Sequence, residues 1–444
     1  MSQTLDLSRG VARLLFGVPG ADHGEDRDAM TVTARVSAAP DVARESSARP
    51  WPAERQVPAV TPAPRFGPPP GPVLRLGFGG GIAASPKPRL GFFSIKPVVA
   101  ERIAFNGAEP IVRLASNEGA LGPSPKAVEA LHATAAEVHR FPDALHARLR
   151  GMLAARNGID PSRIVCSNGT DEMLHLLAHA YAGQADEIVY SRHGFMNYKV
   201  AALAVGAKPV AAAENAYTAA VDNLLAQVTT RTRLVFLDNP KNPTGTYLPE
   251  AEIRRLHAAL PSQVILVIDE AYAEYVDAGD YRVCFDLADA YDNVVITRTF
   301  SKIYGLGGVR LGWAYCAPAI ADVLNRLRGP FNVSAQALAA GEAALADTGF
   351  VAFSKEHNQI WRGWLTQKLI ELGFTVVPSV TNFVLVPFAS EASANAVDAF
   401  LQHHGVVVRH ATDYGLPECL RITVGREDGM QAVVDTLAAY RRRN

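Results

Sequence analysis

The segment TRTFSKIYGLGGVRLG, residues 297–312, decides how this chain is interpreted, because it joins an apolar run to a glycine-rich turn that carries a lysine. Lys302 follows Ser301, and Arg310 comes eight residues after the lysine. Desolvation lowers the pKa of a lysine among apolar residues and favours the free amine that attacks carbonyl groups. Glycines let the backbone approach a phosphate closely, and a guanidinium matches phosphate oxygens. The segment therefore predicts a nucleophilic lysine beside an anion site; the alternative is a surface loop with routine charged residues.

Strand and helix patterns alternate around this segment from about residue 91 onward. Continuous apolar runs predict buried strands at 187–190, 233–237, 264–268 and 293–297. Apolar residues at helical spacing predict helices over 170–182 and around 320–327. Such alternation is typical of an α/β fold in which helices sandwich a mostly parallel sheet.

The C-terminal hundred residues predict a second, smaller α+β domain. Strands are expected at 406–409 and 420–424, and a final helix places Met430 and Leu437 on one face. We expect the following organisation: an N-terminal arm that contributes to the small domain over 91–120, a large domain over 121–335, and the small domain over 336–444.

The first ninety residues differ from the rest of the chain. Between Pro50 and Leu90, 11 of 41 residues are proline and six are glycine. Proline removes hydrogen-bond donors and glycine raises the entropy of the unfolded chain, so this composition predicts a disordered extension over 1–90. The alternatives are a tail with a binding role and a translation start placed too far upstream.

Bulk composition narrows the class of ligand. The formal net charge of −1 at pH 7 indicates neither a nucleic-acid nor an anionic-membrane partner and favours a small molecule. The four cysteines show no metal-ligand spacing, so neither a zinc site nor a disulfide framework is expected, and they fit a cytoplasmic setting. We find no apolar run of membrane-spanning length and no export signal.

Polar residues follow two of the predicted strands. DNPKNPTG (238–245) places Asn242 in a proline-bounded turn, and IDEAY (268–272) ends a strand with Asp269 and Tyr272. Taken singly, Asp269 would more often cap a helix and Asn242 would form a turn. Ligands bind at the carboxyl ends of strands in parallel α/β sheets, so these residues are expected to face one crevice together with Lys302.

Together these stretches resemble the fold-type I aminotransferases, and within that group the histidinol-phosphate aminotransferases. The resemblance runs from about residue 94 to the C-terminus. It is carried, in the family's order, by LASNEGALGPSP (114–125), FPD (141–143), NGTDE (168–172), HGFMNYKVAA (193–202), NPTGT (242–246), DEAY (269–272), the segment around Lys302, and CLRITVG (419–425). The resemblance implies an aspartate aminotransferase-like fold, pyridoxal 5′-phosphate bound by the large domain, and a homodimer.

The resemblance also implies a role for each residue that surrounds the cofactor. Lys302 would bind it as a Schiff base and move a proton as general acid and base. Asp269 would pair with the ring nitrogen and keep it protonated. Asn242 and Tyr272 would hydrogen-bond the ring oxygen, and Phe195 would stack on the ring face.

Two further groups of residues complete the implied site. The phosphate would lie at a helix N-terminus formed by Gly169, Thr170 and Asp171, together with Ser301 and Arg310.

On the substrate side, Arg421 would bind the carboxylate of glutamate or 2-oxoglutarate. Arg409 would help to hold a substrate phosphate, and Asn117 and Glu118 would lie on the segment that closes over the site.

The sequence departs from the family's usual pattern at three positions. Phe141 and Val98 stand where tyrosines are usual, and Lys241 precedes Asn242 where asparagine is usual. The loss of these two hydroxyls weakens the assignment to a phosphorylated substrate more than it weakens the cofactor site.

The implied reaction transfers the amino group of L-histidinol phosphate to 2-oxoglutarate, giving imidazole acetol phosphate and L-glutamate. Alternatives on the same scaffold are an aromatic amino-acid aminotransferase and a phosphothreonine decarboxylase. A transcription regulator or binding protein with an aminotransferase-like domain is an alternative of another class. Residues 1–90 show no helix-turn-helix pattern for a regulator.

Overall fold

The computed structural model describes residues 92, 94–95 and 112–443. All of the described residues belong to one unit, Ala84–Asn444. The predictions for residues 1–90, for Val98 and for most of the N-terminal arm therefore lie outside the described residues.

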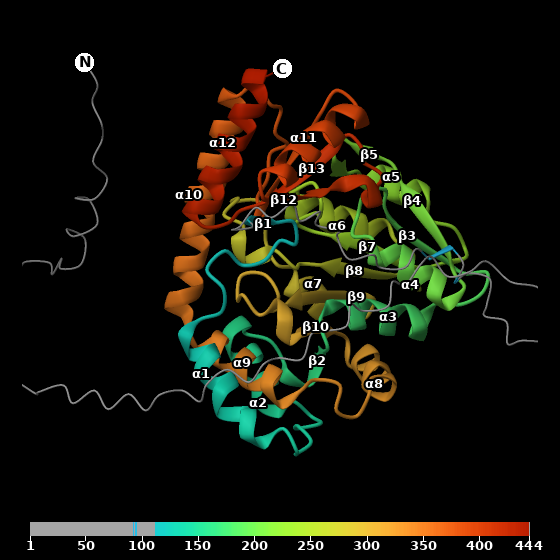
Figure 1. Cartoon of the computed structure of the whole chain (residues 1–444). Coiled ribbons are helices and arrows are strands. Elements are labelled where there is room, and N and C mark those ends of the chain that lie inside the picture. The colour runs from blue at the N-terminus through green and yellow to red at the C-terminus, as the bar shows by residue number, and fades with distance from the viewer. Residues whose placement is uncertain (1–91, 93, 96–111, 444) are drawn as a thin grey trace, which may run out of the picture. The chain divides into compact units, whose positions relative to one another are not determined.

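A seven-stranded sheet forms the larger part of the fold, in the order β2-β10-β9-β8-β7-β3-β4 (Figure 1). Its strands are β2 (Ile164–Ser167), β3 (Glu187–Ser191), β4 (Lys208–Ala212), β7 (Thr232–Asp238), β8 (Ile265–Asp269), β9 (Val294–Thr299) and β10 (Gly312–Cys316). Neighbours pair in parallel except β10, which is antiparallel to both β2 and β9. The predicted mostly parallel sheet is confirmed, with one antiparallel strand added.

Helices cover both faces of this sheet. One buried cluster joins the strands to α3 (Thr170–Tyr181), α4 (Asn197–Val205) and α8 (Pro318–Leu327). A second joins them to α1 (Pro125–Thr134), α2 (Ala147–Asn157), α5 (Val221–Ala226), α6 (Glu250–Ala259), α7 (Phe285–Ala290) and α9 (Ala335–Ala346). Short 3-10 turns lie at Ala135–Glu137, Pro161–Arg163, Ala273–Tyr275 and Gly307–Val309, and a small hairpin at β5 (Glu214–Asn215) and β6 (Thr218–Ala219).

A second sheet of four strands draws on both ends of the described chain. Its order is β1-β12-β13-β11, with β1 (Val112–Leu114), β11 (Phe383–Pro387), β12 (Val406–His410) and β13 (Cys419–Thr423). The 3-10 turn η8 (Ala411–Tyr414) follows β12. Helices α10 (Thr348–Glu371), α11 (Glu391–His403) and α12 (Glu427–Arg443) pack against this sheet. The two-sheet architecture confirms the predicted α/β fold class, whereas the domain boundaries at 121, 335 and 336 stay predictions.

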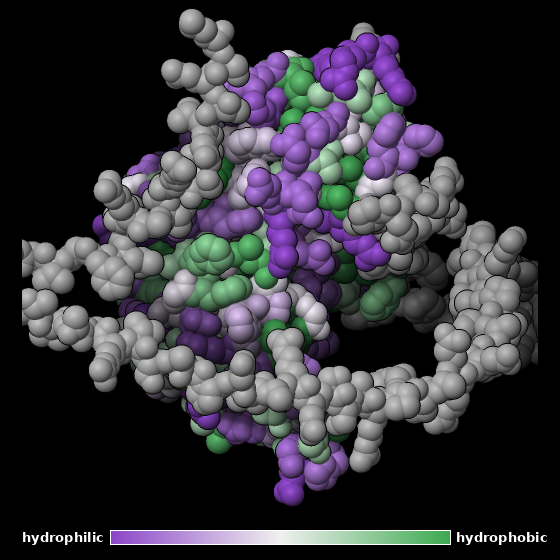
Figure 2. All heavy atoms as spheres, turned by 60° about the vertical axis from the view of Figure 1, so that its left-hand side comes forward, coloured by the Kyte–Doolittle hydropathy of each residue, from purple (hydrophilic) through white to green (hydrophobic). Residues whose placement is uncertain are grey.

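The surface around the second sheet is mixed in polarity. Figure 2 brings the left-hand side of Figure 1 forward, where α10 and α12 lie, and shows hydrophilic side chains interspersed with smaller apolar areas. Within the described ranges, none of the helices is both long enough and apolar enough to cross a membrane.

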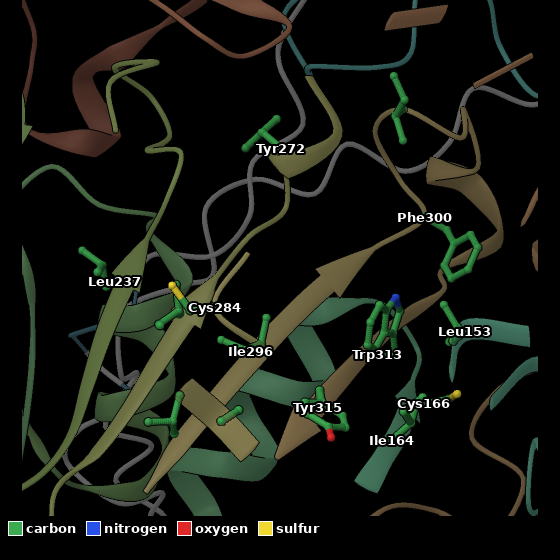
Figure 3. Close-up of a cluster of buried hydrophobic side chains, with 14 of the residues drawn as sticks. Leu153, Ile164, Cys166, Leu237, Tyr272, Cys284, Ile296, Phe300, Trp313 and Tyr315 are labelled. Carbon is green, nitrogen blue, oxygen red and sulfur yellow. The ribbon is translucent and has the colours of Figure 1, made fainter. Parts of the chain in front are cut away.

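Alternation along the central strands explains why both faces are apolar. Val235 and Leu237 belong to one buried cluster, while Leu234 and Phe236 belong to the other. Figure 3 shows the cluster that contains Leu237 of β7 and Ile296 of β9, two strands with β8 between them. Because side chains of a strand alternate between faces, a strand covered on both sides must be apolar throughout.

The four cysteines, Cys166, Cys284, Cys316 and Cys419, are buried and free. Burial raises the pKa of the Cys166 thiol to about 12, which suits a packing role better than a reactive one. Among the described residues no cluster of histidine, cysteine and acidic side chains could hold a metal ion.

Candidate active site

A cavity of about 310 Å³ lies where the carboxyl ends of β7 and β8 and the turn after β9 meet the second sheet. It is lined by almost all of the candidates from the sequence: Asn117, Glu118, Thr170, Asp171, Phe195, Asn242, Asp269, Tyr272, Ser301, Lys302, Arg310 and Arg421. Parallel strands end at the same edge of the sheet, which is why motifs far apart in sequence converge there.

Lys302 lies in the turn that follows β9. Its Nζ donates to the carbonyl oxygen of Ser116 at 3.4 Å and sits 5.7 Å from the centre of the Tyr272 ring. Burial, followed by the positive charge of Arg421, lowers the pKa of Lys302 to about 8. Roughly a tenth of this side chain is therefore the free amine at pH 7, far more than for a lysine with the ordinary pKa.

Asp269 ends β8 and is buried. Tyr198 donates its hydroxyl to Oδ2 at 3.0 Å, and Thr297 donates its hydroxyl to Oδ1 at 3.1 Å. Burial raises the pKa of Asp269 to about 7, with a further contribution from the negative charge of Asp238. Two neutral hydroxyls are weak compensation for a buried carboxylate, so the group is suited to a cationic ligand.

Arg421 points from β13 toward the turn that carries Asn242. Its Nη1 donates to Asn242 Oδ1 at 2.5 Å and to the Tyr414 hydroxyl at 3.4 Å, and its Nη2 donates to the Ala115 carbonyl at 2.6 Å. Among the described residues the buried Nε has no hydrogen-bond partner. An arginine with an unused donor inside a cavity can still bind a carboxylate.

Asn117 fixes the segment at the mouth of the cavity. Its Nδ2 donates to the Tyr272 hydroxyl at 2.9 Å, and its backbone N–H donates to Thr423 at 3.0 Å. Asn382 donates to the carbonyl oxygens of both Asn117 and Glu118. Asn117 has a φ of 55°, a left-handed conformation that asparagine tolerates better than most residues.

The anion end of the cavity is built at the start of α3. The helix begins at Thr170, and no side chain caps its first turn. Arg310 donates to Asp171 Oδ2 at 3.1 Å and to the Ser301 hydroxyl at 3.3 Å. Gly169 does not line the cavity, but a Cβ there would come within 2.3 Å of Arg310, so glycine is required for this approach.

Besides Gly169, one site residue predicted from the sequence, Arg409, does not line the cavity. Arg409 forms an ion pair with Asp413 at 3.1 Å and is not one of the lining residues. Phe141 also lies outside the lining; it is 81% exposed and stacks on Phe331 at 4.6 Å between ring centres.

Several residues of the site were not singled out from the sequence. Tyr198 lies within the quoted stretch HGFMNYKVAA, and Tyr414 lines the cavity from η8. Asp238 ends β7, and its Oδ2 accepts from the backbone N–H groups of Asn242 at 3.0 Å and Phe195 at 3.2 Å. The strand-end position of Asp238 was a usable signal, because it matches that of Asp269 on the neighbouring strand.

The cavity fits pyridoxal 5′-phosphate in size and chemistry. Its volume is within the range of small-molecule sites, roughly 300–1,000 Å³. The amine of Lys302 can react with an aldehyde, Asp269 can hold a ring cation, and the uncapped start of α3 beside Arg310 can hold a phosphate.

Comparison with known proteins gives the same picture. Residues 109–437 match the family model described as Aminotransferase class I and II. A histidinol-phosphate aminotransferase from Paramagnetospirillum magneticum is 54% identical over 358 residues, which are 80% of this chain and 99% of that protein. One from Rhodospirillum centenum shows the same identity and coverage.

Solved structures extend the comparison to the fold. The crystal structure of histidinol-phosphate aminotransferase from Sinorhizobium meliloti in complex with pyridoxal 5′-phosphate has a TM-score of 0.76 and 27% identity, covering 81% of this chain and 99% of that one. A single mutant of Thermus thermophilus aspartate aminotransferase shares the fold, with a TM-score of 0.71 at 19% identity over 80% of this chain and 100% of that one. The chain belongs to the class I and II aminotransferase family.

Proposed function

We propose that this protein transfers the amino group of L-histidinol phosphate to 2-oxoglutarate, giving imidazole acetol phosphate and L-glutamate as a step of histidine biosynthesis. The observation that carries the proposal is the presence, in one cavity, of the Lys302 amine and the buried Asp269 carboxylate. Relatives of about half identity that carry the name histidinol-phosphate aminotransferase support the choice of amino donor.

Pyridoxal 5′-phosphate, when bound, supplies an electron sink for the negative charge that develops at the substrate Cα. Lys302 would hold it covalently through Nζ, and after release that amine would take the proton from the substrate Cα and deliver it to the cofactor carbon C4′. A pKa of about 8 suits both directions of transfer. Asp269 would keep the ring nitrogen protonated, and the cation would in turn favour the ionised carboxylate.

The remaining cofactor contacts would come from α3 and from the loops that follow β3, β7, β8 and β9. Phe195 would stack on the ring, and Asn242 and Tyr272 would donate to its oxygen. The phosphate would lie at the start of α3, held by backbone N–H groups of Thr170 and Asp171 and by Ser301 and Arg310. Arg310 would then exchange its contact with Asp171 for the phosphate.

The substrate contacts would lie on the side of the second sheet. Arg421 would bind the carboxylate of 2-oxoglutarate, with Nε as the donor that is still unused. Asn117 and Glu118 would close over the substrate. Arg409 is proposed to bind the substrate phosphate, which requires it to give up its ion pair with Asp413.

We also propose that the protein is a cytoplasmic homodimer. Val138, Phe141 and Leu145 are 67%, 81% and 64% exposed, and they lie close together in sequence. Exposed apolar side chains grouped in this way are typical of an interaction surface.

A half-reaction screen tests the proposed donor. The cofactor-loaded protein is mixed, without 2-oxoglutarate, with histidinol phosphate, phenylalanine, tyrosine or phosphothreonine, and the absorbance of the bound cofactor is followed. Histidinol phosphate should react fastest. A faster reaction with phenylalanine or tyrosine would instead assign an aromatic amino-acid aminotransferase, and carbon dioxide release from phosphothreonine would assign a decarboxylase.

A further inference from the structure

We propose that Lys241 is a positioning residue of this site, because its buried ion pair with Glu214 ties together the two loops that carry Asn242 and Phe195. This inference rests on the proposed function, in which both loops contact the cofactor ring.

The ion pair is more deeply buried than most in this protein. Lys241 Nζ lies 2.9 Å from Glu214 Oε1, and the two side chains are only 1% and 3% exposed. Lys241 belongs to the turn that follows β7, whereas Glu214 begins the small hairpin after β4. The contact therefore joins segments that no strand pairing holds together.

Glu214 extends this link to the loop that carries Phe195. Its Oε1 accepts from the Ser191 hydroxyl at 2.6 Å and from the backbone N–H of His193 at 2.7 Å. The Nδ1 of His193 in turn lies 2.8 Å from the carbonyl oxygen of Tyr414, which lines the cavity. Through the Glu214 carboxylate, Lys241 is thus linked to the loop that carries Phe195 and, through His193, to Tyr414.

The turn around Lys241 is itself closed by backbone hydrogen bonds. The N–H of Lys241 donates to the Thr246 carbonyl at 2.8 Å, and the N–H of Gly245 donates to the Lys241 carbonyl at 2.8 Å. A displacement of the lysine side chain would therefore move the turn as a unit, including Asn242.

Charge gives Lys241 a second effect on the same loops. Its Nζ is 3.9 Å from Oδ1 of Asp238, the carboxylate whose Oδ2 accepts from the N–H groups of Asn242 and Phe195. Burial raises the pKa of Asp238, and the charge of Lys241 works against that rise; Glu214, Asp269 and Tyr198 are the other titratable groups on this side. Without the lysine, Glu214 and Asp238 would both lose the buried cation that lies closest to their carboxylates.

The test measures cofactor affinity by titrating the apoprotein with pyridoxal 5′-phosphate. Lys241→Met and Glu214→Gln should each weaken binding by about ten-fold or more, because each leaves a buried charge without its partner. The double variant should bind the cofactor more tightly than the product of the two single effects predicts, because it leaves neither buried charge without a partner. The circular dichroism of the bound cofactor should change in both single variants, because it reports ring orientation.

Lys208→Met is the matched control. Lys208 pairs with a buried glutamate as well, Glu187 at 3.3 Å, but its own side chain is 67% exposed and lies at the opposite end of the sheet. It should leave cofactor affinity and dichroism unchanged. Wild-type binding and dichroism in both single variants, or independent multiplication of their effects, would overturn the inference. Failure of the wild-type protein to react with histidinol phosphate would instead contradict the proposed function.

Discussion

Buried carboxylates at the two ends of the large sheet have pKa values that are shifted in opposite directions. At the amino end of β3, Glu187 accepts from Thr229 at 2.6 Å, Arg231 at 2.7 Å and Lys208 at 3.3 Å. The hydrogen bond from Thr229, followed by those from the two cations, outweighs burial and lowers the pKa of Glu187 to about 2. At the carboxyl end of β8, Asp269 meets only two hydroxyls, and burial raises its pKa to about 7.

The difference indicates that Glu187 stabilises the fold, whereas Asp269 is suited to bind a cationic ligand. A paired carboxylate is stable in the folded protein as it stands, whereas an ionised carboxylate without a cation costs free energy until a cation arrives. The amino end should therefore control stability and the carboxyl end should control binding and turnover.

The strongest test at the carboxyl end is Lys302→Ala. It removes the covalent anchor and the proton carrier together, so kcat/KM should fall by at least about a thousand-fold. The visible absorbance of the lysine-bound cofactor should disappear, while the apoprotein should not lose stability, because burial disfavours the charged form of Lys302 in the folded state. Turnover near the wild-type rate would end the assignment of Lys302.

Asp269→Asn should lower kcat by about a hundred-fold, because a neutral amide cannot keep the ring nitrogen protonated. In the apoprotein the same change should be stabilising. A carboxyl with a raised folded-state pKa contributes stability that is present below its ordinary pKa of 3.8 and is lost as the pH rises through about 7. In denaturant titrations, the free energy of unfolding of the variant should therefore rise relative to that of the wild type between pH 4 and 7. A constant difference between the two free energies over that range would contradict the comparison.

Arg421→Ala should raise the KM for 2-oxoglutarate by about ten- to a hundred-fold, which matches the loss of a charge-assisted contact. Initial rates at several 2-oxoglutarate concentrations give the measurement. An unchanged KM would remove Arg421 as the carboxylate anchor.

Glu187→Gln should have the smallest effect on catalysis and a clear effect on stability. We expect it to lower the free energy of unfolding by about 1 kcal/mol at neutral pH, because Thr229 and two largely exposed cations lose a charged acceptor. The lowered pKa of Glu187 contributes stability that is present above its ordinary value of 4.5 and is lost as the pH falls through about 2. The difference in free energy of unfolding between wild type and variant should therefore shrink below pH 4.5, and kcat should be unchanged. A loss of turnover would show that the amino end of the sheet also affects catalysis.

The sequence predicts those parts of the site that depend on strand ends and local motifs. Lys302, Asp269 and Asn242 follow apolar strands, so their convergence could be expected from the parallel sheet alone. Tyr198, Thr297 and Tyr414 could not be expected, because each contributes one hydroxyl across a distance that no local pattern encodes.

Sequence patterns do not predict where a side chain points or whether a strand pairs in parallel or antiparallel. The strand before Arg409 was predicted, but the direction of its side chain depends on Asp413 in the following turn. The antiparallel course of β10 was not predicted, since the run GWAYC is apolar on both faces like its parallel neighbours.

The pairing of β1 with β12 has a consequence for the order in which this protein can be made. Val112 finds its partner only in Val406, while every strand of the seven-stranded sheet precedes residue 317. On a ribosome, the large sheet can assemble while β1 still waits for the last part of the chain. A nascent chain that terminates before β13 would then contain Lys302 without Arg421, which lines the same cavity.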